Sequence, residues 1–187
     1  MPEVWQAVAR ETQLPELLKT TRDIPVYEDL MDYRLDILRA QGITLTDIQN
    51  EIAKLKPLDG AKDFLDWAGE RFQVAIISDT FYEFAGPLMV QLGDPFLLCH
   101  KLIVEDDRVV GYKLRQTDPK RHSVKAFKSL DLKVIAAGDS FNDVSMLEEA
   151  DHGIFFQAPE NVRAQFPQYP LAADYAELQA LIEEAVG

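Results

Sequence analysis

The stretch VIAAGDSFND, residues 134–143, decides the fold, because an apolar run ends in Gly138 and is followed at once by acidic and amide side chains. The stretch VAIISDT, residues 74–80, follows the same plan. Continuous apolar runs of this kind are typical of parallel strands whose two faces are both covered by helices. In such sheets, ligands bind at the carboxyl ends of the strands. The two stretches therefore predict an α/β fold with a mainly parallel sheet and a polar site at one edge.

The hydrophobic period changes near Lys56. Before this residue, apolar side chains recur at helical spacing in three segments, and Gly42 is a natural helix stop between the second and the third. After it, the pattern predicts helix 59–70, strand 72–78, helix 81–92, strands 96–104 and 109–114, helix 119–129, strand 133–138, helix 141–149, strand 153–157 and a helix near 172–185. We expect a helical domain over residues 1–56 and an α/β domain over residues 57–187.

The turn residues Asp106 and Asp107 separate two runs of alternating apolar and polar residues. Such an arrangement is typical of two antiparallel strands joined by a tight turn. We therefore expect a short β-hairpin attached to the sheet.

Composition excludes several classes of partner. The chain of 187 residues carries a formal net charge of −13 and has no run of Lys and Arg, which argues against a nucleic-acid partner. It contains no apolar stretch as long as a membrane span, and its first residues lack the pattern of a signal peptide. We expect a cytoplasmic protein that acts on a small molecule.

The positions of the cysteine and histidine residues argue against thiol and zinc chemistry. The single cysteine, Cys99, lies among apolar residues and is expected to be a buried thiol. His100, His122 and His152 have no zinc-type spacing, and each is expected to be a surface or partly buried histidine. The sequence also lacks the G-x-S-x-G nucleophile elbow and the glycine-rich nucleotide loops.

Ser78 and Asp79 are expected in the loop after the first of the two strands, with Thr80 at the start of the next helix. A hydroxyl group and the unpaired backbone N–H groups of a helix start form an anion site. The alternative is that Ser78 or Asp79 only caps the helix.

Asp139, Asn142 and Asp143 follow the second strand, after a glycine that permits a tight turn. Two carboxylates four residues apart across such a turn can converge on Mg²⁺, which prefers oxygen ligands. The alternative is that the acidic side chains only stabilise the N-terminus of the next helix.

Lys120 lies at a predicted helix start, with Asp118 as the N-cap residue and Pro119 at the first helical position. A lysine there points along the same edge of the sheet as Asp139. The alternative is a solvated surface charge, which is the expected role of Arg121, Lys125 and Lys128.

The order of a strand with Ser78, then Lys120, then a strand with GDxxxD resembles the second, third and fourth motifs of the haloacid dehalogenase superfamily of phosphotransferases. Within it, the chain is similar to the phosphoserine phosphatase branch. It is most similar to the bifunctional phosphoserine phosphatase/homoserine phosphotransferases of the ThrH type, through TTRDIP, IQNEIAKLKPLDGA, ISDTFYEF, LLCHKL, RVVGY, LRQTDPKR, FKSL, VIAAGDS and APENV.

The resemblance implies a Rossmann-like core and a role for each motif residue. Ser78 and the backbone of Asp79 would hold the phosphoryl oxygens, and Lys120 would neutralise the charge that builds on them. Mg²⁺ would be bound by Asp139 with Asp143. Asn142 would lie against the phosphate or the leaving group.

The resemblance also makes residues 1–56 a helical cap that recognises the amino acid. Glu3 would bind the ammonium group of the substrate, and Arg34 would bind its carboxylate through two hydrogen bonds. Two alternatives remain open. Glu3 could only favour the N-terminus of the first helix, and Arg34 could form ordinary surface pairs with Asp32 and Asp36.

The chain departs from the family at its start. Family members begin with a strand that ends in Asp-x-Asp, or Asp-x-Glu in the ThrH type, whose first Asp attacks phosphorus and whose second acid protonates the leaving oxygen. No such motif occurs in these 187 residues. We expect the first core strand and the nucleophile to be missing here because of a misplaced start codon or a truncated gene model.

Three hypotheses follow for function. The intact protein would be a Mg²⁺-dependent phosphatase acting on phosphoserine, and its aspartyl phosphate would pass to water or to homoserine. Alternatively, the chain would be a non-catalytic protein that binds phosphoserine or another anion, or an inactive truncated fragment.

Overall fold

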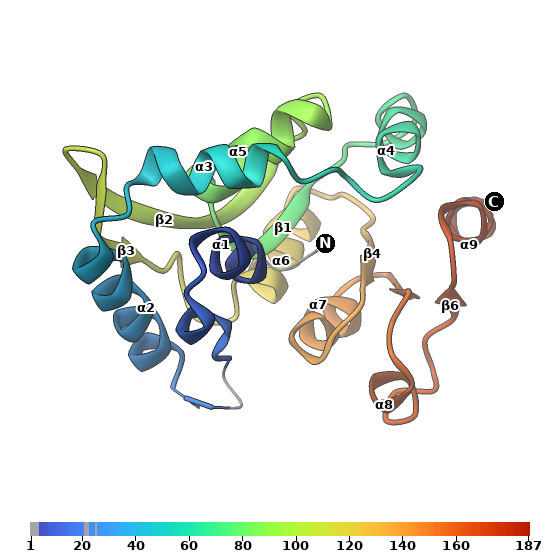
Figure 1. Cartoon of the computed structure of the whole chain (residues 1–187). Coiled ribbons are helices and arrows are strands. Elements are labelled where there is room, and N and C mark those ends of the chain that lie inside the picture. The colour runs from blue at the N-terminus through green and yellow to red at the C-terminus, as the bar shows by residue number, and fades with distance from the viewer. Residues whose placement is uncertain (1–3, 21–22, 25) are drawn as a thin grey trace. The chain divides into compact units, whose positions relative to one another are not determined.

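The fold was obtained as a computed structural model, which describes residues 4–20, 23–24 and 26–187. The chain forms two compact units, one ending at Arg115 and the other beginning at Gln116 (Figure 1). The elements in order are α1 (Val4–Thr12), η1 (Pro15–Leu18), α2 (Tyr27–Gln41), α3 (Leu45–Ala53), α4 (Ala61–Gly69), β1 (Ile76–Phe81), α5 (Tyr82–Gln91), β2 (Leu97–Glu105), β3 (Arg108–Lys113), α6 (Pro119–Lys128), β4 (Ile135–Gly138), η2 (Phe141–Asp143), α7 (Val144–Glu149), β5 (His152–Phe156), α8 (Glu160–Arg163), β6 (Leu171–Ala172) and α9 (Tyr175–Val186).

The helices of the first unit begin and end at residues that suit those positions. Gly42 has a φ of 67° and follows α2, which confirms the predicted helix stop, since the left-handed conformation costs glycine little. Helix α3 begins with a capping box, in which Thr44 accepts a hydrogen bond from the Asp47 backbone at 3.1 Å and Asp47 accepts one from the Thr44 backbone at 2.9 Å.

The first unit contains a three-stranded sheet in the order β1-β2-β3. Strands β1 and β2 are parallel, whereas β2 and β3 form the predicted antiparallel hairpin. Helices α3 and α5 contact each other, and α5 also contacts strands β1 and β2 (Figure 1). A single apolar cluster holds this unit together, with Val8, Ala9, Leu17, Met31, Leu35, Leu38, Leu45, Ile48, Ile52, Phe81, Phe84, Ala85, Leu88, Met89, Leu102 and Val109.

The turn of the hairpin also fixes the start of α3. Asp106 and Asp107 have φ angles of 46° and 62°, as a tight turn between antiparallel strands requires. The Asp107 carbonyl accepts a hydrogen bond from the Leu45 backbone at 2.7 Å, and its carboxylate accepts one from the Thr46 backbone at 3.1 Å. The hairpin therefore satisfies backbone donors at a helix N-terminus far away in sequence.

The second unit contains a three-stranded parallel sheet in the order β4-β5-β6. Ile135 pairs with His152, and Phe155 pairs with Leu171. Helix α7 contacts both β4 and β5, whereas α9 contacts β5 and β6. The buried apolar side chains of the unit include Val124, Ala136, Val144, Met146, Leu147, Ile154, Phe155, Val162, Ala172 and Leu178.

The prediction of an α/β fold with a mainly parallel sheet is confirmed, with differences in detail. The strands form two sheets rather than one. Within the described residues, β1 is paired on one side only, with β2, and β4 only with β5. Most of β1 is therefore half-buried rather than fully buried. The short elements η1, α8 and β6 were not predicted, because each is too short to show a hydrophobic period.

The division into a cap over residues 1–56 and a core over residues 57–187 stays a prediction. The two compact units divide the chain at a different place, between residues 115 and 116. In the part of the chain that the structure describes, no helix combines the length and the apolar character needed to cross a bilayer.

Candidate functional site

Ser78, Asp79 and Thr80 lie inside strand β1, where the sequence predicted a loop and a helix start. The ladder between β1 and β2 is nevertheless interrupted there. Ile77 pairs with Leu98 and the next aligned pair is Phe81 with His100, so three residues of β1 stand opposite one residue of β2. The three residues therefore bulge out of the regular ladder, and their backbone groups are not fixed by regular strand pairing.

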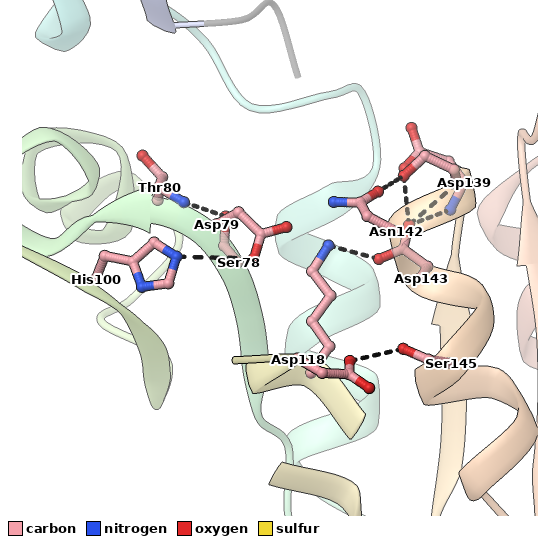
Figure 2. Close-up of polar contacts among 11 residues, drawn as sticks. Ser78, Asp79, Thr80, His100, Asp118, Asp139, Asn142, Asp143 and Ser145 are labelled. Carbon is pink, nitrogen blue, oxygen red and sulfur yellow. Dashed lines mark hydrogen bonds and ion pairs between the residues drawn. The ribbon is translucent and has the colours of Figure 1, made fainter. Parts of the chain in front are cut away.

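The alternative that these residues cap the next helix is wrong. Helix α5 begins at Tyr82, and its N-cap residue is Phe81, which makes no side-chain cap. Ser78 instead accepts a hydrogen bond at 3.3 Å from the backbone N–H of Thr80, two residues on (Figure 2). This short local turn is typical of serine and holds the hydroxyl group next to the bulge.

His100 lies beside the Asp79 carboxylate. The ring is buried, with 5% of its surface exposed, so the expectation of a surface or partly buried residue is wrong for His100. Its Nε2 is 3.9 Å from Asp79 Oδ1 (Figure 2). Its Nδ1 accepts a hydrogen bond from the Arg115 backbone at 3.1 Å. Sequence reasoning missed the pair of His100 and Asp79 because the two residues come from different strands. The other two histidines, His122 and His152, are exposed, as expected.

The loop after β4 is organised around Asp143, which is buried. Its Oδ1 accepts a hydrogen bond from Lys120 Nζ at 2.7 Å. Its Oδ2 accepts three more, from the Asp139 backbone at 3.0 Å, the Ser140 backbone at 3.1 Å and the Ser140 hydroxyl at 2.8 Å. Figure 2 shows Asp143 at the centre of these contacts, with Asn142, whose side chain accepts a hydrogen bond from Ser140.

The four hydrogen bonds that Asp143 accepts favour its charged, carboxylate form. Burial by itself raises the pKa of this carboxyl group, but the charge of Lys120 and the hydrogen bonds from Lys120, Ser140 and Asp139 outweigh burial and hold the pKa below its usual value. Asp143 is thus a carboxylate at neutral pH. Ser140 and Asp143 also form a capping box, so the helix-stabilising alternative is partly right: Asp143 does stabilise a helix start while it pairs with Lys120.

Gly138 is needed because a larger side chain would not fit at this position, rather than because a tight turn requires glycine. A methyl group on its Cα would lie 2.6 Å from Asp143 Cγ and 2.9 Å from Asp143 Oδ2. Real side chains do not approach each other so closely. Gly138 therefore lets the Asp143 carboxylate fold back over the end of strand β4.

Lys120 is placed by the start of helix α6. Asp118 is the N-cap residue as predicted, with Pro119 at the first helical position. The Asp118 side chain does not cap its own helix, however, and accepts a hydrogen bond from Ser145 of α7 at 2.8 Å (Figure 2). Lys120 is buried at 7% exposure, so the alternative of a solvated lysine is wrong.

The other cations of helix α6 lie on its surface, as expected. Arg121 and Lys125 pair with Glu149 at 2.9 and 3.8 Å, and Lys128 pairs with Asp151 at 3.0 Å. These pairs are partly exposed to solvent and contribute little to stability.

The fit of a metal ion depends on Asp139. Its side chain is exposed and offers the hard oxygen atoms that Mg²⁺ prefers. Most acceptor positions of Asp143 are already used by Lys120 and the loop, which favours a supporting role for it. Among the residues with described positions, no three His, Cys, Asp or Glu side chains gather as a metal site. A Mg²⁺ ion held by one or two carboxylates and otherwise by water and substrate oxygens fits this donor set.

Arg34 is buried in the first unit rather than paired on the surface. Its Nη2 donates to the Lys19 carbonyl at 2.7 Å, and its guanidinium group stacks over the Trp5 ring at 4.5 Å. Asp36, a suggested surface partner, pairs with Arg39 instead. The role of Arg34 toward a substrate carboxylate stays a prediction. Glu3, the expected partner of the ammonium group, lies outside the described residues.

Cys99 is a buried thiol, as predicted. Burial raises its pKa to about 12, so the thiolate that a nucleophile or metal ligand requires hardly forms near neutral pH. Besides the pair of His100 and Asp79, sequence reasoning missed Ser140 and Ser145 among the residues that organise the two sites. The pattern Ser-x-x-Asp over residues 140–143 is a capping-box signal and could have identified Ser140.

Comparison with known proteins links these sites to a family. The pattern of the haloacid dehalogenase-like hydrolases matches residues 6–151. A protein named phosphoserine phosphatase ThrH from Pseudomonas aeruginosa is 61% identical over 180 residues, which are 96% of this chain and 88% of that protein. A phosphoserine phosphatase from Pseudomonas syringae pv. tomato is 59% identical over 96% of this chain and 76% of its own length.

Solved structures agree with this similarity. The crystal structure of phosphoserine phosphatase from T. onnurineus in complex with NDSB-201 superimposes with a TM-score of 0.69 at 28% identity, and the match covers 96% of this chain and 86% of that one. The resemblance first seen in the GDxxxD motif is therefore confirmed over nearly the whole chain.

Proposed function

The chain belongs to the haloacid dehalogenase-like hydrolase family, and from this premise we propose that it is a Mg²⁺-dependent phosphoserine phosphatase that can also transfer the phosphoryl group to homoserine. The observation that carries the proposal is the buried ion pair between Lys120 and Asp143 at 2.7 Å. A cation buried at a helix start, held by a GDxxxD loop, is what a developing phosphoryl charge requires. The similarity to proteins named phosphoserine phosphatase supports the choice of substrate.

Each residue in the proposal has a defined task. The Ser78 hydroxyl and the backbone of Asp79 hold phosphoryl oxygens, a role supported by the bulge that frees this part of β1 from regular pairing. Lys120 neutralises the negative charge that builds up on the phosphoryl group, and Asp143 fixes the lysine in place. Asn142 contacts the phosphate or the leaving group, and Arg34 grips the carboxylate of the amino acid.

Asp139 would hold Mg²⁺, with Asp143 supporting the site. When bound, the ion would neutralise charge on the phosphoryl oxygens and orient them. Asp143 keeps the Asp139 backbone in place through its hydrogen bond at 3.0 Å, so the position of the ligand depends on the same carboxylate that positions Lys120.

The nucleophile belongs to the family's first motif, which no part of these 187 residues matches. We propose that catalysis requires this motif, an apolar strand that ends in Asp-x-Glu or Asp-x-Asp. Its first carboxylate would form a bond to phosphorus as the bond to the seryl oxygen breaks, and its second acid would give that oxygen a proton. The resulting aspartyl phosphate would then pass its phosphoryl group to water or to homoserine.

The test compares two proteins, the chain extended at its N-terminus by an apolar strand with this motif and the chain of 187 residues. Phosphate release from phosphoserine with and without Mg²⁺ measures activity, and phosphorylation of added homoserine measures transfer. We expect the extended chain to release phosphate and the shorter chain to bind phosphoserine without releasing it. No binding of phosphoserine by either chain, or no phosphate release by the extended chain, would contradict the proposal.

A matched pair of lysine variants tests the role of Lys120. In the extended chain, Lys120→Met should lower kcat by about 10² to 10³, the usual effect of removing one group that stabilises transition-state charge. Lys125→Met removes a lysine from the same helix but from its exposed side, and should leave kcat unchanged. Equal effects of the two variants would mean that Lys120 has no special role. Binding of phosphoserine with no release by the extended chain would favour the non-catalytic alternative.

A further inference from the structure

The segment proposed to hold the phosphoryl group carries a negative charge of its own. Asp79 lies in the β1 bulge between Ser78, whose hydroxyl would bind a phosphoryl oxygen, and Thr80. A carboxylate this close to a phosphate dianion repels it strongly, even near a protein surface. A phosphate can be bound here only if the Asp79 side chain is kept turned away from it.

His100 is placed to hold the Asp79 side chain. It comes from strand β2, opposite the end of the bulge, and its Nε2 faces Asp79 Oδ1 at 3.9 Å (Figure 2). The ring is buried against Phe81, with the two ring centres 5.9 Å apart. At this distance the contact is an attraction between a ring N–H group and a carboxylate rather than a short hydrogen bond.

The tautomer of His100 follows from its other nitrogen. Nδ1 accepts a hydrogen bond from the Arg115 backbone N–H at 3.1 Å, so Nδ1 cannot carry a proton while this bond is made. The proton of the neutral ring is then on Nε2, the atom that faces Asp79. The backbone of Arg115 thereby keeps His100 as a neutral donor that points at the carboxylate.

We propose that His100 is a positioning residue, which in its neutral Nε2–H form keeps the Asp79 carboxylate away from the bound phosphoryl group. The proposal rests on the proposed function, because it concerns the same phosphate site. It assigns a task to a buried histidine that the catalytic roles above do not use. The competing view is that His100 only fills space in the first unit.

A double-mutant cycle in the chain of 187 residues separates these views. Calorimetry measures the affinity of each variant for inorganic phosphate and for phosphoserine. His100→Phe keeps the ring size but removes the donor, and should weaken binding about tenfold, within the usual range of coupling between neighbouring groups. Asp79→Asn removes the charge, so adding His100→Phe to Asp79→Asn should change the affinity less than twofold. Equal losses in both backgrounds, or no loss in either, would overturn the proposal.

A second variant covers the case in which His100→Phe does not fold. His100→Gln places an amide N–H group near the position of Nε2 and should bind both probes within about threefold of the wild type, because the donor toward Asp79 is restored. A loss as large as that expected for His100→Phe would contradict the positioning role.

The tautomer can be measured without any ligand. The chain has only three histidines, so the ring signals that disappear from a long-range ¹H–¹⁵N spectrum in His100→Phe or His100→Gln belong to His100. We expect a neutral ring with its proton on Nε2 at pH 7, and a shift of that nitrogen in Asp79→Asn. A proton on Nδ1 would overturn the proposal. If the wild type binds neither probe, the proposed function and the positioning role both fail, whereas equal losses in the cycle overturn the positioning role alone.

Discussion

Gly138 leaves just enough space for the carboxylate that organises the loop after β4. Because an added methyl group would lie 2.6 Å from Asp143 Cγ, Gly138→Ala must push Asp143 away from Lys120 and from the loop backbone. We expect a loss of about 2 kcal/mol in the free energy of unfolding, as for other overpacked sites, measured by urea denaturation.

The matched control is Gly69→Ala. Apart from its two chain neighbours and the backbone of its own helix, no atom lies within 4 Å of the position that its methyl group would take, and the residue ends helix α4. This variant should be neutral or slightly stabilising, since alanine favours a helix more than glycine does. A similar loss in both variants would show that the contact with Asp143 is not the cause.

The pair of Asp143 and Lys120 should make stability depend on pH. The folded-state pKa of Asp143 lies below its usual value, so the carboxylate stabilises the fold at neutral pH. This contribution is complete above about pH 5 and is lost as the pH falls below about 4, through the lowered folded-state pKa. Asp143→Asn leaves the Lys120 charge buried without its anion and should cost about 3 kcal/mol at pH 7.

Urea denaturation of the wild type and Asp143→Asn between pH 7 and pH 3 measures this dependence. The difference in unfolding free energy between the two proteins should shrink as the pH falls, because protonated Asp143 resembles asparagine. A difference that stays constant over this range would show that the charge of Asp143 is not what stabilises the loop.

At the scale of single elements, helix α3 depends on a cap that is visible in the sequence. Thr44 and Asp47 satisfy each other's backbone N–H groups at the start of the helix. Thr44→Ala should cost about 1 kcal/mol in unfolding free energy, the usual value for a lost N-cap. Thr44→Ser keeps the hydroxyl group and should cost much less, so equal losses measured by thermal denaturation would contradict the role of the cap.

The elements that were predicted well are those whose signals are local. Gly42 ends α2, Asp118 begins α6, and Asp106 and Asp107 turn the hairpin, because each position depends on the conformation of the residue itself. The strand with Ser78 was placed four residues too early, since β1 begins at Ile76 rather than residue 72. Its bulge depends on pairing with β2, which no local pattern of β1 reveals.

In the candidate sites, too, local sequence patterns do not reveal contacts between distant segments. The sequence identified Ser78, Lys120, Asp139 and Asp143 by motif, but not what surrounds them. That Lys120 is buried against Asp143, and that His100 faces Asp79, follows from contacts between distant segments. The reason for Gly138 was likewise misjudged, because space around a residue is a tertiary property.

At the scale of the whole molecule, the net charge of −13 is the property that the sequence gives most directly. Excess negative charge repels itself more in a compact state than in an unfolded chain. The exposed ion pairs, such as that of Asp36 with Arg39, contribute little against this repulsion. Electrostatics as a whole should therefore destabilise the folded protein at low ionic strength.

Salt should accordingly stabilise the protein. Raising sodium chloride from about 20 to 200 mM shortens the Debye length to below 10 Å and should raise Tm by a few degrees at pH 7. Glu183→Gln with Glu184→Gln removes two exposed negative charges from the last turn of α9, where the helix dipole already disfavours them. This variant should raise Tm at low salt, and the gain should shrink as salt is added. If Tm instead falls with salt in the wild type, the exposed ion pairs outweigh the repulsion of the net charge.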